Sequence, residues 1–297
     1  MSRWCAALGL DLLLGEPPAR LHPVVWIGWL IGWLESRAPS APRSQLLYGV
    51  AVAAVPPLGA ALLGLMVRLV RPRALRTLLA VWLLKTTFSL RGLLAAGDAV
   101  EERLAADDLD GAREALRSLV GRERAGLDRS HIASAAVESA AENFADSYVA
   151  PLLWYGIGGI PAALAYRAVN TADAMVGHRG RHEYLGKASA RLDDLANLVP
   201  SRLSAVALAA AAPLVGLSAS GATRTMRRDH GATASPNAGW PMAAAAGAAG
   251  VWLEKLEHHR LGDGRGPQAS DVRAVRRLVL AAAGLSTVLA VLVWERR

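Results

Sequence analysis

Apolar runs long enough to cross a membrane constrain this chain more than any other feature. Residues Leu46–Val70 form an apolar run of about 25 residues, enough to cross a bilayer with some tilt. Leu203–Leu217 and Leu278–Trp294 are further apolar runs, and Pro151–Ala168 is apolar and rich in glycine. Hydrophobic residues make up 53% of the chain and charged residues 20%. This balance favours several membrane spans joined by substantial polar segments.

None of these runs alternates strictly between polar and apolar residues, so the predicted fold class is all-α. We predict a polytopic membrane protein with about four or five transmembrane helices, a polar helical segment at residues 98–130, and re-entrant or interfacial helices. The whole of residues 1–297 is expected to form a single membrane-embedded domain.

Local composition predicts an interfacial helix and two helix breaks. Trp26, Trp29 and Trp33 share one helical face, as in an aromatic anchor at the membrane surface. Pro56–Pro57 should kink or break the first long run. A second break is expected within Gly156–Pro161.

The formal net charge of +8 is unevenly distributed, because acids outnumber arginines in residues 98–129 and the rest of the chain is strongly basic. Basic loops beside apolar spans suit anionic lipid headgroups or an anionic substrate. Nucleic-acid binding is not expected, because no basic stripe is interleaved with aromatic residues. Cys5 is the only cysteine, which excludes an intrachain disulfide and a cysteine-rich metal site. We expect no cleavable signal peptide.

Three acids recur every four residues just before an apolar run. On a helix, Glu138, Glu142 and Asp146 would share one face, where like charges repel and the cost of ionisation rises near lipid. Mg²⁺, which prefers oxygen ligands, is the natural counter-charge. Pairing with arginines from elsewhere, or protonation of one acid, is equally compatible with the spacing.

Two further polar groups follow. Arg167, Asn170 and Asp173 are three residues apart at the end of an apolar segment, where polar residues usually serve a site; the alternative is a solvated helix end. Farther along, Arg191 and Asp194 share a face, and Arg191 could bind a phosphate or carboxylate through two hydrogen bonds. The alternative there is a simple pair between the two side chains.

Taken together and in order, these segments closely resemble the CobD/CbiB family, and the matches span almost the whole chain. The matching stretches are Leu10–Pro17 with His22–Pro23, Lys85–Arg91, Glu138–Asp146, Ala165–Gly177, Ala190–Arg202 and Ser235–Pro241. Several consecutive matches are far more specific than any single motif. Two departures stand out: Phe144 and Ala145 replace hydroxyl residues common in the family, and Glu16 replaces an aspartate.

The resemblance implies an enzyme of corrinoid (vitamin B12) biosynthesis. Its activity would be the ATP-dependent ligation of adenosylcobyric acid to (R)-1-aminopropan-2-yl phosphate, or to ethanolamine phosphate, through an amide. It also implies Mg²⁺ and a bacterial inner-membrane location, with the active site facing the cytoplasm and possible contact with other membrane-bound enzymes of cobalamin assembly. Alternatives from other classes are a Mg²⁺-dependent phosphotransferase of the CDP-alcohol type and a non-catalytic corrinoid transporter or assembly subunit.

The residues assigned to this activity fall into three sets, of which the catalytic and metal-binding sets overlap. The catalytic set is Glu138, Glu142, Asn143, Asp146 and Asp173. The metal-binding set is Glu138, Glu142, Asp146 and Asp173. The substrate- or phosphate-binding set is Lys85, Arg91, Arg167, Asn170, Arg191, Asp193, Asp194 and Asn237. ATP is expected to bind without a P-loop, because no such motif is present.

Overall fold

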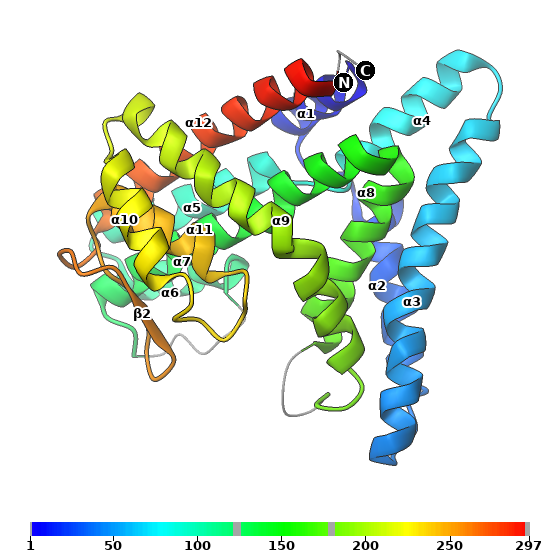
Figure 1. Ribbon diagram of the computed structural model, residues 1–297, viewed down its shortest axis with the longest axis horizontal. Coiled ribbons are helices and arrows are strands. Elements are labelled where there is room, and N and C mark those ends of the chain that lie inside the picture. The colour runs from blue at the N-terminus through cyan, green and yellow to red at the C-terminus, as the bar shows by residue number, and fades with distance from the viewer. Residues whose placement is uncertain (1, 121–125, 178–181, 295–297) are drawn as a thin grey trace. The chain divides into compact units, whose positions relative to one another are not determined.

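The computed structural model describes residues 2–120, 126–177 and 182–294, which are helical almost throughout (Figure 1). The all-α fold class is therefore confirmed. The chain divides into two compact units, each described by itself below. The first comprises Met1–Ser89, Ala150–Asn197 and Trp294–Arg297, and the second Leu90–Val149 and Leu198–Val293. The prediction of one domain over residues 1–297 stays a prediction.

Among the residues that the structure describes, five helical segments are long and apolar enough to cross a membrane. They are Pro42–Leu69, Arg73–Ala105, Arg129–Val176, Lys187–Val215 and Ala269–Trp294. This number agrees with the four or five spans predicted from the sequence, and the chain is a multi-pass membrane protein.

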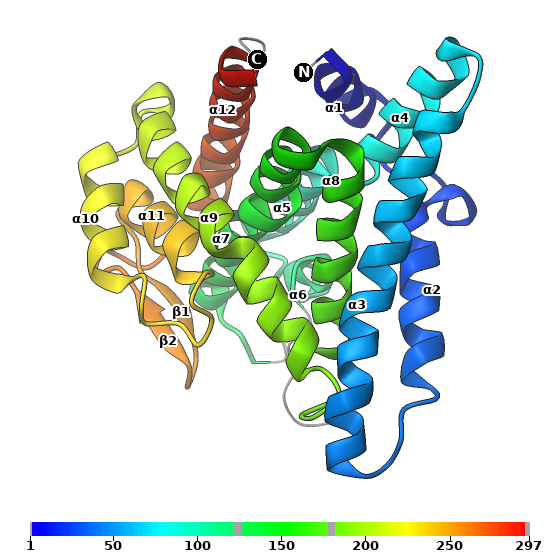
Figure 2. The ribbon, with the colours of Figure 1, turned by 45° about the vertical axis from the view of Figure 1, so that its right-hand side comes forward.

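The first unit is built around two long helices. Its elements are α1 (Ser2–Leu14), η1 (Ala19–Leu21), α2 (Pro23–Glu35), α3 (Pro42–Met66), η2 (Val67–Leu69), α4 (Arg73–Lys85), α8 (Ala150–Val176) and the first part of α9 (Lys187–Ala211). Helix α3 packs along α8 and beside α2 (Figure 2), and α1 packs against α4. A Cβ at Gly64 of α3 would lie 2.8 Å from the Cα of Pro161, so only glycine permits this close approach of α3 to α8.

The two predicted helix breaks have different outcomes. In α8, Gly159 has φ 69° and ψ −157°, so the break near Pro161 is confirmed. At Pro56–Pro57 a break is wrong, because α3 runs continuously through both residues, and the kink that was the alternative stays a prediction. Both prolines are buried, and a membrane helix packed against neighbours can tolerate the lost backbone hydrogen bonds. The tryptophan-bearing segment is a helix, α2, with all three indoles exposed; its membrane-anchoring role stays a prediction.

The second unit surrounds a buried alanine-rich helix. Its elements are α5 (Leu90–Ala105), α6 (Leu109–Ala115), η3 (Leu116–Ser118), α7 (Arg129–Phe144), the π-helical turn η4 (Ala145–Val149), η5 (Ala212–Val215), α10 (Ala219–Asp229), α11 (Gly239–Ala249) and α12 (Ala269–Trp294), together with the end of α9. Every residue of α7 from 132 to 141 is buried, and α7 packs against α5 and α11. Small side chains allow these helices to lie close together.

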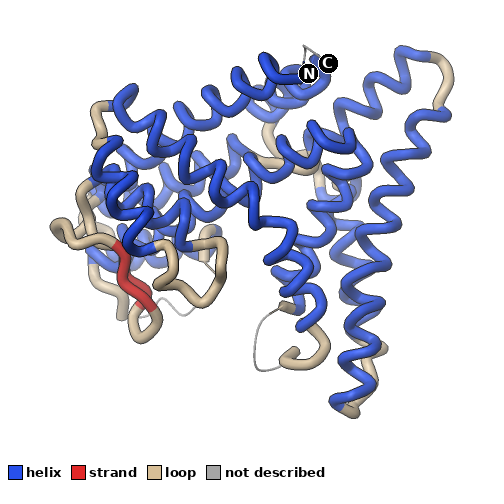
Figure 3. Tube along the Cα trace, viewed as in Figure 1, coloured by secondary structure: helices blue, strands red, loops and turns tan. Residues whose placement is uncertain are grey.

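The sequence did not indicate a short β-hairpin in the second unit. Strands β1 (Leu253–Lys255) and β2 (His259–Leu261) pair antiparallel, with Leu253 opposite Leu261 (Figure 3). Three residues per strand are too few to show an alternating pattern. The polar segment predicted at 98–130 is helical in its described part, where Asp108 caps α6 by accepting a hydrogen bond from the backbone N–H of Gly111.

Candidate functional site

A polar cluster lies between α8 and α9 in the first unit. Asn170 on α8 donates its side-chain Nδ2 to Oδ1 of Asp193 over 3.4 Å, and Asn197 donates Nδ2 to Oδ2 over 3.0 Å. The hydroxyl of Tyr166 donates to Oδ1 of Asn197 over 2.8 Å. Both oxygens of Asp193 are thus occupied by amide donors. Linked polar groups inside span-length apolar helices are costly, and they usually mark a functional site.

The cluster extends to an arginine on α8. Arg167 donates Nη1 to Oδ1 of Asn170 over 3.3 Å, the contact that their three-residue spacing predicts. Its Nε is buried and has no hydrogen-bond partner among the described residues. A buried donor without a partner carries a cost of about 1–3 kcal/mol. Arg167 is therefore held at one nitrogen and can offer another to a ligand.

Two glycines hold the end of α8 close to the start of α9. A Cβ at Gly186 would overlap the backbone carbonyl of Val176, and one at Gly177 would overlap the side chain of Asp173. Backbone cannot move aside as a flexible side chain can. The end of α8 and the start of α9 therefore approach this closely only with glycine at these positions. This packing keeps Asp173 close enough to Asp193 for their charges to interact.

The acids of this cluster suit a cation. Asp173 and Asp193 present carboxylates from two helices, and neighbouring like charges in a low-dielectric environment favour a positive group between them. Mg²⁺ is usually held by one or two carboxylates together with substrate phosphates, so such a pair fits a magnesium–nucleotide complex. Within the described ranges, no group of three or more His, Cys, Asp or Glu side chains could hold a metal ion by itself. The predicted magnesium site stays a prediction.

The predicted ligands on α7 and η4 belong to the second unit and lie in different environments. Glu138 is buried, with Oε1 3.4 Å from Nε2 of His259 on β2. Glu142 is exposed, and Asp146 is half-buried. The side chain of Asn143 donates to the carbonyl of Ser139 in its own helix over 2.9 Å.

Asp146 lies within the π-helical turn η4 (Ala145–Val149). A π turn holds an extra residue, so side chains after its start are rotated relative to a regular α-helix. The four-residue spacing from Glu142 therefore does not place Asp146 as a helical wheel does. Such turns occur frequently at functional sites.

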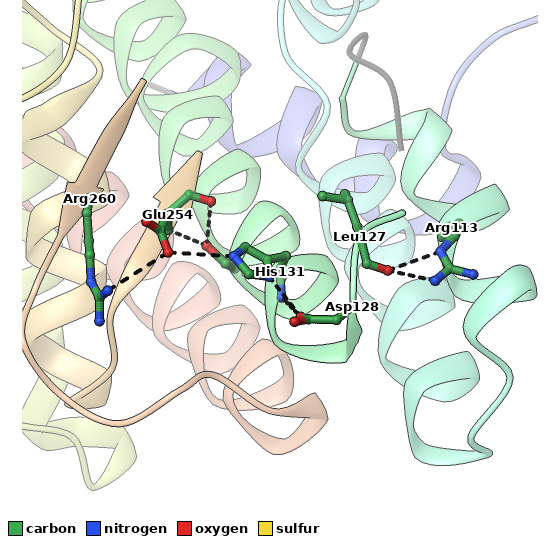
Figure 4. A network of polar contacts seen from close by, with 7 residues as sticks. Arg113, Leu127, Asp128, His131, Glu254 and Arg260 are labelled. Carbon is green, nitrogen blue, oxygen red and sulfur yellow. Dashed lines mark hydrogen bonds and ion pairs between the residues drawn. The ribbon is translucent and has the colours of Figure 1, made fainter. Parts of the chain in front are cut away.

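A network of polar contacts joins the start of α7 to the hairpin (Figure 4). Asp128 caps α7, and its Oδ1 lies 2.9 Å from Nδ1 of His131. Nε2 of the same imidazole lies 3.6 Å from the carboxylate of Glu254 on β1, which in turn lies 4.0 Å from Arg260 on β2. Hydrogen bonding from His131 lowers the pKa of Asp128 although burial opposes it. The network fixes the hairpin that carries His259 against α7.

Asn237 is buried at the centre of a second polar group in the second unit. Its Oδ1 accepts from Ser201 over 3.3 Å and from Nη1 of Arg202 over 3.2 Å. The guanidinium of Arg202 also lies over the ring of Trp240, at 4.8 Å from its centroid. His230 packs against the same ring. Asn237 therefore orients an arginine, and its predicted role in substrate binding stays a prediction.

Lys85 and Arg91, both predicted to bind substrate or phosphate, have different surroundings. Lys85 is buried and lies 3.2 Å from Asp11 and 2.8 Å from Glu16. Its charge is therefore compensated within the protein, which distinguishes it from a lysine that awaits a phosphate. Arg91, at the start of α5, is exposed.

Glu16 is the other end of this ion-pair group. Burial raises its pKa, but hydrogen bonds with His22, Lys85 and Ser89 outweigh burial and lower the pKa from 4.5 to about 2. The carboxylate is thus ionised throughout the physiological range.

On α9, Arg191 is exposed and Asp194 is half-buried. A phosphate can therefore approach Arg191 from outside the protein.

Sequence reasoning missed several side chains of these groups. Tyr166 and Asn197 complete the cluster around Asp193, yet neither was assigned to the site. Asn197 could have been found, because it follows Asp193 by four residues and so shares its helical face. His259 gave no signal, because its contact with Glu138 joins residues that are distant in the sequence.

Comparison with known proteins shows which family the chain is similar to. A family model described as "CobD/Cbib protein" matches residues 4–279. The chain is 41% identical over 262 residues to the cobalamin biosynthesis protein CobD of Dehalococcoides mccartyi (strain CBDB1), covering 86% of this chain and 85% of the relative. It is 45% identical over 252 residues to the protein of that name from Geobacter metallireducens, covering 83% and 79% of the two chains.

An archaeal relative, the probable cobalamin biosynthesis protein CobD of Methanothermobacter thermautotrophicus, is 41% identical over 258 residues, which are 86% of this chain and 85% of the relative. No solved structure matches the chain. The family match covers nearly all of the chain and includes both polar groups around Asp193 and Asn237. The chain belongs to the CobD/CbiB family of cobalamin biosynthesis proteins.

Proposed function

We propose that the chain catalyses the ATP-dependent joining of adenosylcobyric acid to (R)-1-aminopropan-2-yl phosphate, or to ethanolamine phosphate, through an amide bond. Family membership supports the pathway. The observation that carries the substrate assignment is Arg167, whose Nη1 is fixed by Asn170 while its buried Nε has no acceptor among the described residues. A phosphate oxygen of the amino alcohol is the acceptor that this arrangement suits.

The chemistry requires activation, because a carboxylate is a poor electrophile. The corrinoid carboxylate would attack the γ-phosphorus of ATP, which forms an acyl phosphate and releases ADP. The amine of the second substrate would then attack the acyl carbon. Inorganic phosphate leaves and the amine loses a proton, so the amide forms with one ATP consumed. Mg²⁺, when bound, offsets charge on the ATP phosphates, and its predicted ligands are Glu138, Glu142, Asp146 and Asp173.

The first unit supplies the means to bind the amine substrate. Asp193 uses both oxygens to hold Asn170 and Asn197, so we assign it a positioning role. Asn170 accepts a hydrogen bond from Arg167 and so orients its guanidinium. With Arg191 as a second cation, the guanidinium of Arg167 would grip the phosphate, while the carboxylate of Asp173 attracts the substrate's ammonium group.

The remaining predicted residues complete the proposal. Asn143 would orient the substrate, and Asp194, Arg91 and Asn237 would help to bind it. Lys85, whose charge is already paired with Asp11 and Glu16, is given no substrate-binding role in this proposal. We place the site on the cytoplasmic side of the inner membrane, where ATP and the corrinoid are made, and other membrane-bound enzymes of cobalamin assembly are proposed neighbours.

A product assay tests the reaction. Purified protein is incubated with ATP, adenosylcobyric acid and each candidate amine, and the products are analysed by mass spectrometry. We expect an amide product, with ADP formed only when both acid and amine are present. ATP cleavage that ignores either substrate, or no amide from either amine, would reject the ligase.

Arg167→Gln tests the phosphate assignment. The wild type should prefer aminopropanol phosphate to aminopropanol itself, and the variant should lose this preference through a raised KM for the phosphorylated amine. Arg43→Gln removes an exposed arginine from α3 of the same unit and serves as the matched control. An unchanged preference in Arg167→Gln would assign the phosphate to other residues.

A further inference from the structure

A basic pocket of about 570 Å³ lies in the first unit and shares no residue with the α8–α9 cluster. Three arginines line it, Arg3 from α1, Arg68 from η2 and Arg76 from α4. Tyr155 and Trp294 add two aromatic rings. Its other lining residues are small or apolar, so the arginines are the only charged groups among the described residues that line it.

Within the part of the chain that the structure describes, no acidic side chain compensates the charge of this pocket. No acidic residue lines it, and none of its arginine side chains forms an ion pair or hydrogen bond within residues 2–120, 126–177 and 182–294. Arg3 and Arg68 are exposed and Arg76 is half-buried. Three positive charges around one hollow raise the local concentration of anions. The pocket is therefore built for an anionic ligand.

Two of the pocket's arginines lie at the ends of candidate membrane spans, the positions at which a span meets the lipid headgroups. Arg68 is one residue before the end of the span Pro42–Leu69, and Arg76 is three residues after the start of the span Arg73–Ala105. With a rise of 1.5 Å per residue, both lie within roughly 5 Å of the turn that joins the two spans. Tyrosine and tryptophan, which also line the pocket, are enriched at this depth of a bilayer.

Apolar surface adjoins the same arginines. Leu65, Leu69 and Leu78 flank Arg68 and Arg76 in the sequence and have 44%, 79% and 67% of their surface exposed. Exposed leucines beside arginines match a ligand with an anionic head and apolar tails. A small soluble anion would use the arginines and leave the leucines uncovered.

We propose that this pocket binds the headgroup of an anionic phospholipid. Arg3, Arg68 and Arg76 hold the lipid phosphate, and the acyl chains run along the exposed leucines of η2 and α4. Basic pockets between membrane helices are recognised sites for such headgroups. The bound lipid would neutralise the arginines and link α1, η2 and α4 at the membrane surface.

Native mass spectrometry of the detergent-purified protein tests the proposal. The full chain is titrated with phosphatidylglycerol, which is anionic, and with phosphatidylcholine, which is zwitterionic. We expect tighter binding of phosphatidylglycerol. Arg68→Gln with Arg76→Gln should weaken it roughly tenfold or more, since each arginine near a membrane surface is worth about 1 kcal/mol. Arg68→Lys with Arg76→Lys should restore most of the affinity.

The matched control removes two exposed arginines from α10, Arg224→Gln with Arg227→Gln, and should leave the affinity unchanged. Equal losses in both double glutamine variants would show that general surface charge attracts the lipid, and would overturn the pocket. Equal affinity of the wild type for phosphatidylglycerol and phosphatidylcholine would also overturn the proposal. Displacement of phosphatidylglycerol by millimolar ATP or inorganic phosphate would assign the pocket to a soluble phosphate instead.

Discussion

Lys85 and Asp11 face each other in the interior of the first unit, with Nζ 3.2 Å from Oδ1 and side chains that are 1% and 0% exposed. Glu16 approaches the same ammonium group to 2.8 Å but is 40% exposed. The pair joins α1 to α4, and its two residues are 74 positions apart in the sequence. Removal of one partner would leave the other as a buried, uncompensated charge.

Lys85→Met should therefore destabilise the protein by about 3–5 kcal/mol, which is the usual cost of breaking a buried ion pair. Thermal unfolding in detergent measures the effect. Arg103→Gln breaks the exposed pair with Asp108 and should cost only about 0–1 kcal/mol. Similar melting temperatures for the two variants would show that the charges at Lys85 are solvated.

Acid should weaken the contribution of Glu16. Its pKa is about 2 in the folded protein against 4.5 ordinarily, so its ionised form stabilises the fold above pH 4.5. That stabilisation is lost progressively as the pH falls from 4.5 towards 2. Glu16→Gln should melt below the wild type at pH 7, and the difference should shrink at pH 3. A constant difference between pH 7 and pH 3 would contradict the assignment.

Gly186, directly before α9, should not tolerate substitution by alanine. Gly186→Ala places Cβ on the carbonyl of Val176, so the helix ends must separate, and Asp173 moves relative to Asp193. We expect lower thermal stability and at least tenfold lower ligase activity. Gly9→Ala in α1 is the control, because its new methyl group meets nothing within 4 Å. Higher helix propensity should raise the free energy of unfolding of this variant by up to about 1 kcal/mol. Full activity in Gly186→Ala would show that the close approach is not required.

Asp193→Asn should impair catalysis with little change in shape. Asparagine has one acceptor oxygen and one NH2 group. Either Asn170 or Asn197 would therefore lose its acceptor and lie against the NH2 group of the new side chain, which is also a donor. Through Asn170, Arg167 would lose its orientation. We expect KM for the phosphorylated amine to rise and the preference over the unphosphorylated amine to fall. Glu183→Gln, at an exposed site of the same unit, is the control. Identical kinetics in both variants would remove the positioning role.

Glu142→Gln should abolish amide formation while the protein remains folded in detergent. The substitution removes one charge from an exposed residue, so circular dichroism and thermal unfolding should match the wild type. Glu102→Gln makes the same change at an exposed residue of α5 and should retain full turnover. Near-normal turnover in Glu142→Gln would exclude a role for Glu142 in the activation of the corrinoid carboxylate by ATP.

Local rules predicted the helical framework well, because apolar runs of span length have few alternatives to helices in a membrane. They also placed Arg167 and Asn170 three residues apart on one helix, a spacing that allows the hydrogen bond found between them. They did not exclude a break at Pro56–Pro57, where the helix is continuous because neighbouring helices compensate for the lost backbone hydrogen bonds. The partners of Lys85 and Glu138 could not be predicted from spacing, because Asp11 and His259 lie far along the chain and only the tertiary fold brings them near.

The π turn at Ala145–Val149 makes the second unit sensitive to backbone conformation as well as to side chains. Tyr148, within this turn, forms a hydrogen bond of 2.6 Å with Thr287 of α12. If the same residues formed a regular α-helix, the extra residue would be wound into it, and the side chains at the end of the turn would rotate by up to about 100° around the helix axis. The tyrosine and threonine would both still be encoded, yet they could no longer meet. A sequence comparison that scores only residue identities would overlook this loss.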